Sequence, residues 1–230
     1  MKKWIMVLIA SLSIASTSQA QTFLEKLQKF AGQPDDAGII KNGYYSISGD
    51  GELTSTDGLK QRGTIILNIS NNINSLKGVG FIPEGEMKEK YVRIKNIQNF
   101  VVNGRTFEAV KTKVSSDKIG NEVILMEKLH DANDAKFKMY VMRLLSVDNM
   151  STTVSRSYFA ILPDFPMAYG LEDLKFMPFA KKMASYVEDC PELSQKIKEK
   201  VEDYKYNMFK GAANIDVFFK IMAEYNACGK

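Results

Sequence analysis

The sequence predicts an α+β fold, in which an antiparallel, β-rich body is followed by a C-terminal helical segment tied by one disulfide. Residues 43–162 contain short runs of β-branched and aromatic residues between clusters of Gly, Asn, Asp and Ser, a pattern typical of antiparallel strands. From residue 163 onward, apolar residues recur at intervals of three and four, which indicates helices. The chain of 230 residues is 45% hydrophobic and 25% charged, which excludes collagen-like, largely disordered and coiled-coil proteins.

Residues 1–20 have the three parts of a bacterial signal peptide. Lys2 and Lys3 precede an apolar run over residues 4–14, and Ser18-Gln19-Ala20 is a small-x-small cleavage site. The apolar run is too short to cross a bilayer, which takes about 20 residues. We therefore expect cleavage after Ala20, a periplasmic or secreted mature protein, and no transmembrane segment after cleavage.

Residues 21–42 are predicted to form a short N-terminal helix and a linker. Thr22 and Glu25 have the spacing of a capping box, and Gly32 and Pro34 end the helical pattern that covers Thr22 to Phe30.

The body over residues 43–162 is expected to hold about eight strands. Apolar residues alternate with more polar ones over residues 64–69 and 136–141, which predicts strands with one face on a core. Asn103-Gly104 lies between two such runs and predicts a hairpin with a type I′ turn.

Residues 163–230 are predicted to form helices that pack on the body, so that residues 21–230 make one domain. The apolar positions fall into three groups, which predict three helices. They are Phe176, Phe179, Ala180, Met183 and Val187; Leu193, Ile197, Val201 and Tyr204; and Ile215, Phe218, Phe219, Met222 and Tyr225.

The two cysteines of the chain are expected to form a structural disulfide. Pro191 favours the first helical position, which places Cys190 at a helix start, while Cys228 follows the last helix. In an antiparallel helix pair these two ends meet, and an oxidising compartment allows the bond. A redox-active pair is disfavoured, because the spacing is far from Cys-x-x-Cys.

Two stretches resemble a group of exported proteins of unknown function in Gram-negative bacteria, over about two thirds of the mature chain. The first comprises Asp189-Cys190-Pro191-Glu192-Leu193 with Lys196-Ile197 and Tyr225-Asn226-Ala227-Cys228; the second is the strand pattern from Tyr91 to Val110. The resemblance implies export and a strand-rich body before a helical tail, and it implies no catalytic residue.

Composition and motifs exclude several classes of function. A net charge of +4, which falls to +2 without Lys2 and Lys3, is too weak to recruit nucleic acid. One His and two Cys exclude multi-His sites and zinc ribbons. The sequence has no nucleophile elbow, dinucleotide fingerprint or P-loop, and Gly78-Val79-Gly80 is expected to relieve a strand bend. We predict no catalytic, cofactor-binding or metal-binding residue.

Two polar segments of the body are candidates for chemistry, and the first contains His130. His130 is the one possible imidazole base, but residues 130–134 have the composition of a solvated hairpin turn, in which Asp131 and Asp134 are turn formers rather than metal ligands.

The segment from Asp50 to Gln61 has a partial calcium-loop spacing. Asp50, Glu52 and Thr54 match the first three ligand positions of an EF-hand. Ser55 stands where Gly is required and Gln61 where a bidentate Glu is required, so the match fails.

Aromatic and basic side chains leave binding roles open. The aromatic candidates for stacking on a sugar or peptide are Tyr44, Tyr45, Tyr91, Tyr158 and Tyr169, although strand aromatics usually pack in a core. The lysines at 196, 198, 200, 205 and 210 alternate with acids and indicate a solvated helix surface.

These observations favour an exported, non-catalytic envelope protein that binds an envelope protein or a glycan. The first alternative is a hydrolase of envelope polysaccharide or peptide that uses two carboxylates. The second is a carrier that holds a small apolar ligand between sheet and helices, suggested by the Met- and Phe-rich helices.

Overall fold

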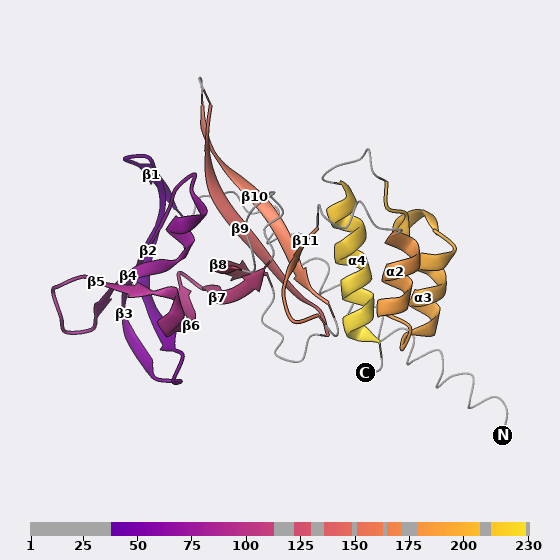
Figure 1. The fold of residues 1–230 in the computed structure, drawn as a ribbon, viewed down its shortest axis with the longest axis horizontal. Coiled ribbons are helices and arrows are strands. Elements are labelled where there is room, and N and C mark those ends of the chain that lie inside the picture. The colour runs from indigo at the N-terminus through magenta and orange to yellow at the C-terminus, as the bar shows by residue number, and fades with distance from the viewer. Residues whose placement is uncertain are drawn as a thin grey trace. The chain divides into compact units, whose positions relative to one another are not determined.

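The structure, a computed structural model, describes residues 38–112, 122–129, 136–148, 151–162, 165–171, 179–207 and 213–228. The expected signal peptide, the expected helix from Thr22 to Phe30, and His130 with its turn lie outside these residues. The chain divides into two compact units (Figure 1). The strand unit contains residues 38–129 and 138–171, and the helical unit contains residues 136–137 and 179–228. That residues 21–230 form one domain stays a prediction.

The strand unit is built on one antiparallel sheet. Its eleven strands within the described residues are β1 (Ile39–Lys41), β2 (Tyr44–Ser55), β3 (Lys60–Ile69), β4 (Gly78–Pro83), β5 (Lys90–Arg93), β6 (Ile97–Val102), β7 (Arg105–Thr112), β8 (Glu122–Lys128), β9 (Lys138–Val147), β10 (Thr152–Ile161) and β11 (Tyr169–Gly170). The strand order is β11-β10-β9-β8-β7-β6-β2-β3-β4-β5, and β1 pairs with β2. The predicted α+β class is confirmed. The body predicted over residues 43–162 holds nine of these strands, β2 to β10, where about eight were expected, and β1 and β11 lie outside its predicted bounds. The strands β1, β5 and β11 are too short for a period of two to be recognised.

Local patterns in the sequence correctly predicted the central hairpins. Ile65, Leu67 and Ile69 of β3 are all at most 1% exposed, as their alternation predicts. Asn103 and Gly104 have φ angles of 51° and 72° and connect β6 to β7, which confirms the predicted type of turn.

Two glycines face each other across β2 and β3 and let further strands come close. Gly51 of β2 pairs with Gly63 of β3. A Cβ atom at Gly51 would lie 2.1 Å from the carbonyl oxygen of Val101, and one at Gly63 would lie 2.2 Å from that of Ile82. Only residues without a side chain allow the neighbouring strands to approach this closely.

The curled sheet encloses its own core. The backbone N–H of Leu145, in β9, donates a hydrogen bond of 2.9 Å to the carbonyl of Ser70 at the end of β3, although β9 and β3 are not neighbours in the sheet. The core between these strands includes Tyr45, Ile47, Ile65, Leu67, Phe81, Phe100, Val102, Ile124, Met126 and Tyr140.

The helical unit contains α2 (Phe179–Tyr186), α3 (Pro191–Lys198) and α4 (Ala213–Ala227), side by side in Figure 1, and the short 3₁₀ helix η5 (Glu202–Tyr204). The three predicted helices are confirmed, and Pro191 occupies the first turn of α3. The helical pattern predicted through Val201 and Tyr204 was too long, because the chain leaves the helix after Lys198 and Lys200 adopts a φ of 54°. Within the described residues, no helix is long and apolar enough to cross a membrane.

The predicted disulfide is confirmed. Cys190 and Cys228 are bonded, with their Cα atoms 6.1 Å apart, so the bridge joins the start of α3 to the end of α4.

The residues around these cysteines hold a distant segment against the helices. Lys136 Nζ lies 2.8 Å from the Asp189 carboxylate and 4.4 Å from the centre of the Tyr225 ring. The ring of Phe137 lies 4.8 Å from that of Tyr225, and the Phe137 N–H donates a hydrogen bond of 3.4 Å to Asn226 Oδ1. The Asp-Cys-Pro and Tyr-Asn-x-Cys elements therefore have a structural role here.

Candidate functional site

The residues singled out in the sequence fall into buried and exposed groups. Tyr45 is 1% exposed and belongs to the core, whereas Tyr44 and Tyr91 are 46% and 63% exposed. Asp50 and Glu52 lie on strand β2 and not in a loop that could wrap around an ion. The two exposed tyrosines and the two acids belong to one side of the sheet, which is the strongest candidate for a binding surface.

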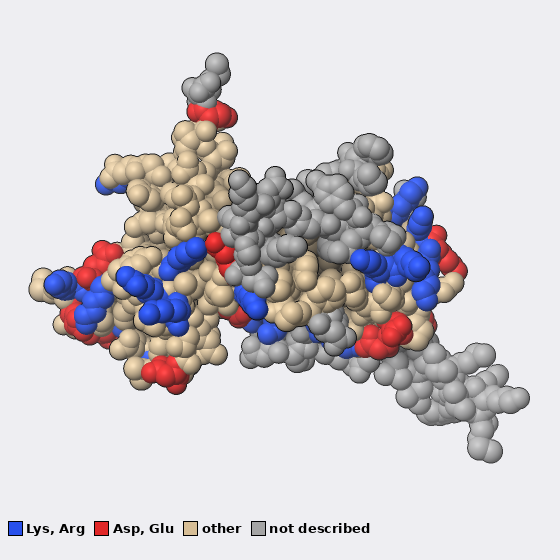
Figure 2. All heavy atoms as spheres, in the orientation of Figure 1, with Lys and Arg blue, Asp and Glu red and all other residues tan. Residues whose placement is uncertain are grey.

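This side of the sheet, the β2–β5 face, is formed by the outward-pointing residues of β2, β3, β4 and β5. Tyr45, Ile47 and Leu53 of β2 are buried in the core. Because side chains alternate along a strand, the residues between them point away from the core. Cross-strand pairs then place their partners in β3 on the same face. The residues of β2 and β3 on this face are Ser46, Ser48, Asp50, Glu52, Thr54, Arg62, Thr64, Ile66 and Asn68. Figure 2 shows basic and acidic side chains intermingled over the part of the strand unit that holds β3, β4 and β5.

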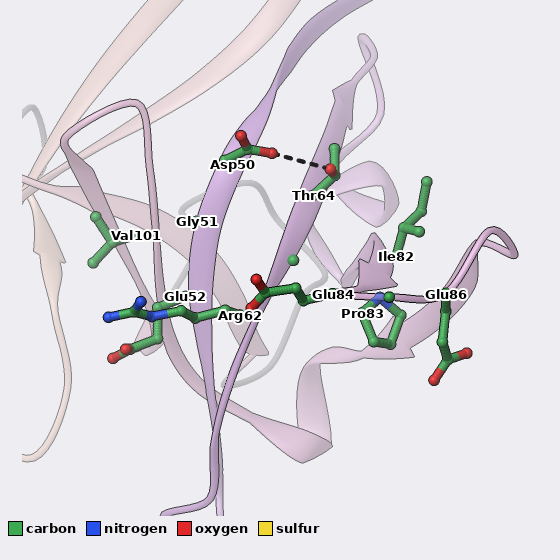
Figure 3. A pocket seen from close by; sticks show the side chains of 12 residues that line it. Asp50, Gly51, Glu52, Arg62, Thr64, Ile82, Pro83, Glu84, Glu86 and Val101 are labelled. Carbon is green, nitrogen blue, oxygen red and sulfur yellow. Dashed lines mark hydrogen bonds between the residues drawn. The ribbon is translucent and has the colours of Figure 1, made fainter.

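The first hollow on the β2–β5 face has a volume of about 650 Å³ and is called the acidic hollow (Figure 3). Its lining includes Asp50, Glu52, Arg62, Thr64, Glu84 and Glu86. At one end the Thr64 hydroxyl donates a hydrogen bond of 3.2 Å to Asp50, as Figure 3 shows. The hollow is open and polar, and no group of three His, Cys, Asp or Glu side chains suited to a metal ion occurs among the described residues.

Two of the acids in this hollow are paired with lysines. Lys60 Nζ lies 2.8 Å from Glu52, and Lys90 Nζ lies 2.6 Å from Glu86. The hydrogen bond from Lys60 holds the pKa of Glu52 below its usual value. A glycosidase needs one carboxyl whose pKa is raised, so that it is protonated at neutral pH, and Glu52 does not meet this requirement. Glu52 is therefore unsuited to be the acid of a glycosidase, and the charged and hydroxyl-bearing lining of the hollow suits the binding of a polar ligand.

The second hollow, called the tyrosine groove, has a volume of about 340 Å³ and lies next to the acidic hollow on the same face. Its lining consists of Tyr44, Ile66, Asn68, Ser70, Asn72, Asn74, Ser75, Gly78, Val79, Gly80, Glu89 and Tyr91. Ile66 of the groove and Thr64 of the acidic hollow are consecutive positions of β3 on this face. The two hollows thus form one extended surface.

Gly78 and Gly80 make the floor of the tyrosine groove. A Cβ at Gly78 would lie 2.5 Å from two atoms of the Tyr91 side chain, and a Cβ at Gly80 would lie 2.2 Å from the Glu89 carboxylate. The two glycines thus let the side chain of Tyr91, in β5, and that of Glu89, directly before β5, lie on the backbone of β4. The sequence predicted relief of a strand bend, and the structure gives these glycines this second role.

Hydrogen bonds hold the turn that ends the groove. Asn72 Oδ1 accepts a hydrogen bond of 2.9 Å from the N–H of Asn74, which caps the 3₁₀ helix η2 (Ile73–Leu76). The Ser75 hydroxyl donates to the Asn72 carbonyl at 2.7 Å and accepts from the N–H of Ser70 at 3.0 Å. The polar wall of the groove is therefore ordered without a ligand.

A buried ion network crosses β7, β8 and β9. Arg105 and Arg143 both donate hydrogen bonds to Glu127, and all three side chains are at most 8% exposed. Burial lowers the pKa of Arg105, but its hydrogen bond to Glu127 and the charge of that carboxylate raise the pKa above the ordinary value overall. All three side chains are buried and bonded to one another, so the network is placed to hold these strands together.

A second buried polar group lies nearby, on β7–β9. Glu108 accepts a hydrogen bond of 2.8 Å from the Tyr140 hydroxyl and lies 3.1 Å from Lys128 Nζ. Burial and the neighbouring Glu108 raise the pKa of Tyr140 above its usual value. Tyr140 thus stays protonated and serves as a donor to Glu108.

The lysines of the helical unit also make structural contacts. Lys196 Nζ lies 3.3 Å from Glu224, and Lys220 Nζ lies 2.6 Å from Asp203. The sequence indicated a solvated surface with local pairs, and the structure shows pairs that join different elements of the unit.

The apolar residues that suggested a carrier are buried in the helices. Met183, Phe218, Phe219 and Met222 are each at most 2% exposed. Their burial agrees with an ordinary core, and the carrier hypothesis stays a prediction.

Sequence reasoning identified Tyr44 and Tyr91 but missed the asparagines and serines beside them. Gly78-Val79-Gly80 was the available signal, since alternate glycines on one face of a strand can admit side chains of a neighbouring strand. No family model matches the chain, and no curated protein and no solved structure matches it either.

Proposed function

We propose that this protein is an exported, non-catalytic binding protein of the bacterial envelope, and that it binds an envelope component through the β2–β5 face. The observation that carries the proposal is the pair of adjoining hollows on this one exposed, polar face. Export rests on the signal-peptide pattern of residues 1–20. The Cys190–Cys228 disulfide supports it, because such bonds persist in oxidising compartments.

The test uses the disulfide-bonded chain of residues 21–230 and two purified probes, a bacterial cell-wall preparation and outer-membrane vesicles. We expect saturable co-sedimentation with one of them. Asp50→Lys reverses a charge in the acidic hollow and should weaken retention by about tenfold, equivalent to ~1.4 kcal/mol. Lys181→Glu reverses a charge that is also exposed, on α2, and should leave retention unchanged.

Three results would contradict this function. If neither probe retains the protein, the proposed function is wrong. If the Asp50→Lys variant is retained as well as the unaltered protein, the β2–β5 face is not the binding surface. Turnover of a glycan or peptide with a bell-shaped pH profile, lost when one acid is replaced, establishes the hydrolase instead.

A further inference from the structure

We infer that the tyrosine groove binds a neutral oligosaccharide, with one sugar ring stacked on Tyr91 and the sugar hydroxyls hydrogen-bonded to the asparagine and serine side chains of the groove. The inference rests on the proposed function, because it names the chemical class of the component that the β2–β5 face takes.

The first argument is the platform that Tyr91 provides. Its side chain is 63% exposed, yet it is in contact with the backbone at Gly78, where a Cβ would lie 2.5 Å from Cζ and Oη. The hydroxyl end of the ring is therefore held against β4, and the exposed surface of the ring is available for an apolar contact. The C–H face of a sugar ring makes such a contact while its hydroxyls stay in polar surroundings. A ring that is already supported loses little conformational entropy when a ligand stacks on it.

The second argument is the polar wall. Asn68 Oδ1 accepts a hydrogen bond of 2.8 Å from the Ser46 hydroxyl, and Asn72 Oδ1 accepts one of 2.9 Å from the N–H of Asn74. Each bond orients an amide group through its oxygen, and the amide N–H₂ is then a donor of fixed direction. Oriented amide donors beside serine hydroxyls match the paired hydroxyls of a sugar, each of which can both accept and donate.

The third argument is charge. Among the residues that line the groove, Glu89 alone carries a full charge, and its carboxylate lies on the backbone of Gly80. A phosphate or a polyanionic chain would meet this negative charge without a cation in the lining to balance it. A neutral sugar would instead donate its hydroxyl protons to the carboxylate, which is a charge-assisted and therefore stronger hydrogen bond.

The length of the surface indicates an oligomer instead of a single sugar. Asn68 lines the groove and Arg62 lines the acidic hollow, six residues away along β3. Six strand residues span about 20 Å. A chain of several sugar rings can follow this path, whereas one ring occupies only the groove.

The experiment titrates the disulfide-bonded chain of residues 21–230 with three neutral tetrasaccharides, cellotetraose, maltotetraose and N-acetylchitotetraose, by isothermal calorimetry and by chemical shifts in NMR spectra. We expect saturable binding of at least one, with shifts at Tyr91, Asn68 and Asn72. Tyr91→Ala should weaken the binding by about tenfold or more, because it removes the platform. Tyr91→Phe should bind within about threefold of the unaltered protein, because stacking does not need the hydroxyl.

Two further variants separate a binding role from a structural one. Gly78→Ala keeps the Tyr91 side chain but displaces it from β4, so it should weaken binding as Tyr91→Ala does. Leu59→Ala replaces an exposed side chain of the β2–β3 turn, 57% exposed and outside the groove, and should bind normally. Circular dichroism and urea unfolding confirm that each variant is folded.

The inference is overturned if none of the three sugars binds at millimolar concentration, or if Tyr91→Ala binds as well as the unaltered protein. Retention by the cell-wall preparation or the vesicles that depends on Asp50 but not on Tyr91 would refute the sugar site alone and leave the proposed function standing. Absence of binding both in the tetrasaccharide titration and in the co-sedimentation test would refute both.

Discussion

Arg105 donates two hydrogen bonds to Glu127, of 2.8 Å from Nε to Oε1 and 2.6 Å from Nη2 to Oε2. The pair joins β7 to β8 at positions that are 7% and 3% exposed. Arg143 of β9 donates to the same carboxylate. One buried carboxylate therefore ties three strands together and balances part of the charge of two guanidinium groups.

Replacing Glu127 should destabilise the strand unit severely. Glu127→Gln leaves two buried arginines without a carboxylate, and breaking a buried pair in this way costs about 3 to 5 kcal/mol. The free energy of unfolding in urea measures the effect. Glu86→Gln is the matched control, because its pair with Lys90 is exposed and is worth less than about 1 kcal/mol. Equal losses in the two variants would contradict a structural role for the buried network.

Removing the disulfide should destabilise the helical unit. The bond joins residues 38 positions apart, and closing a loop of that length stabilises a fold by about 3 to 4 kcal/mol on the chain-entropy argument. The double variant Cys190→Ser, Cys228→Ser and the unaltered protein in reductant should therefore unfold at the same, lower urea concentration, as followed by helical circular dichroism. If reductant leaves the unfolding midpoint unchanged, the disulfide does not stabilise the helical unit.

The ion pair between Lys136 and Asp189 should make the free energy of unfolding depend on pH in the acidic range. The hydrogen bond from Lys136 holds the pKa of Asp189 below its usual value. Folding therefore favours the ionised form of Asp189. The ion pair contributes fully to the free energy of unfolding above the pKa of the unfolded state, about 3.9, and this contribution is lost as the pH falls through the lower pKa of the folded state. Because the two side chains are 35% and 54% exposed, the contribution should be below about 1 kcal/mol.

The variant Asp189→Asn measures this contribution. It should unfold more easily than the unaltered protein at pH 7, and the difference should vanish well below the folded pKa and shrink in concentrated salt. A difference that is independent of both pH and salt would mean that Asp189 acts through packing and not through its charge.

Gly51 should tolerate alanine less well than a glycine in an open turn. Gly51→Ala places a Cβ against the carbonyl oxygen of Val101, and forcing atoms into a packed site costs about 1 to 3 kcal/mol. Gly85→Ala meets no atom within 4 Å and should cost only about 1 kcal/mol, for its positive φ. Hydrogen exchange should show faster opening of the β2–β6 pairing in Gly51→Ala alone. Similar exchange in both variants would argue against close approach of the strands at Gly51.

Much of the fold was predictable from neighbouring residues. The turn at Asn103-Gly104, the buried side of β3 and the start of α3 at Pro191 depend on residue types within a few positions, and all three were predicted correctly. The end of α3 was not predicted, because the apolar spacing continues through Tyr204 although the helix stops. Tyr204 is buried from the 3₁₀ helix η5 instead, and periodicity alone does not distinguish the two.

The candidate site was predictable only in part. Tyr44 and Tyr91 were candidates by residue type, but strand aromatics are usually buried, and only the register of β2 reveals that Tyr45 faces the core while Tyr44 faces outward. Asn68 gave no signal of its own in the sequence, because an isolated asparagine is common in strand ends and turns.

The sequence by itself determined the fold class, the pairing of Cys190 with Cys228, and the alternation that separates a core side from an outer side in β3. In β9 the predicted single core side was wrong, because Met139, Tyr140, Val141 and Met142 are all buried. The fold class and the alternation depend on local spacing, and a chain with two cysteines allows only one intramolecular pairing. Only the tertiary structure decided that Tyr44, Asn68 and Tyr91 share one groove. They lie on three different strands, β2, β3 and β5, and the register of strand pairing brings them together. It also decided that Gly78 supports Tyr91, because a contact between backbone and ring requires the strands to be placed in space.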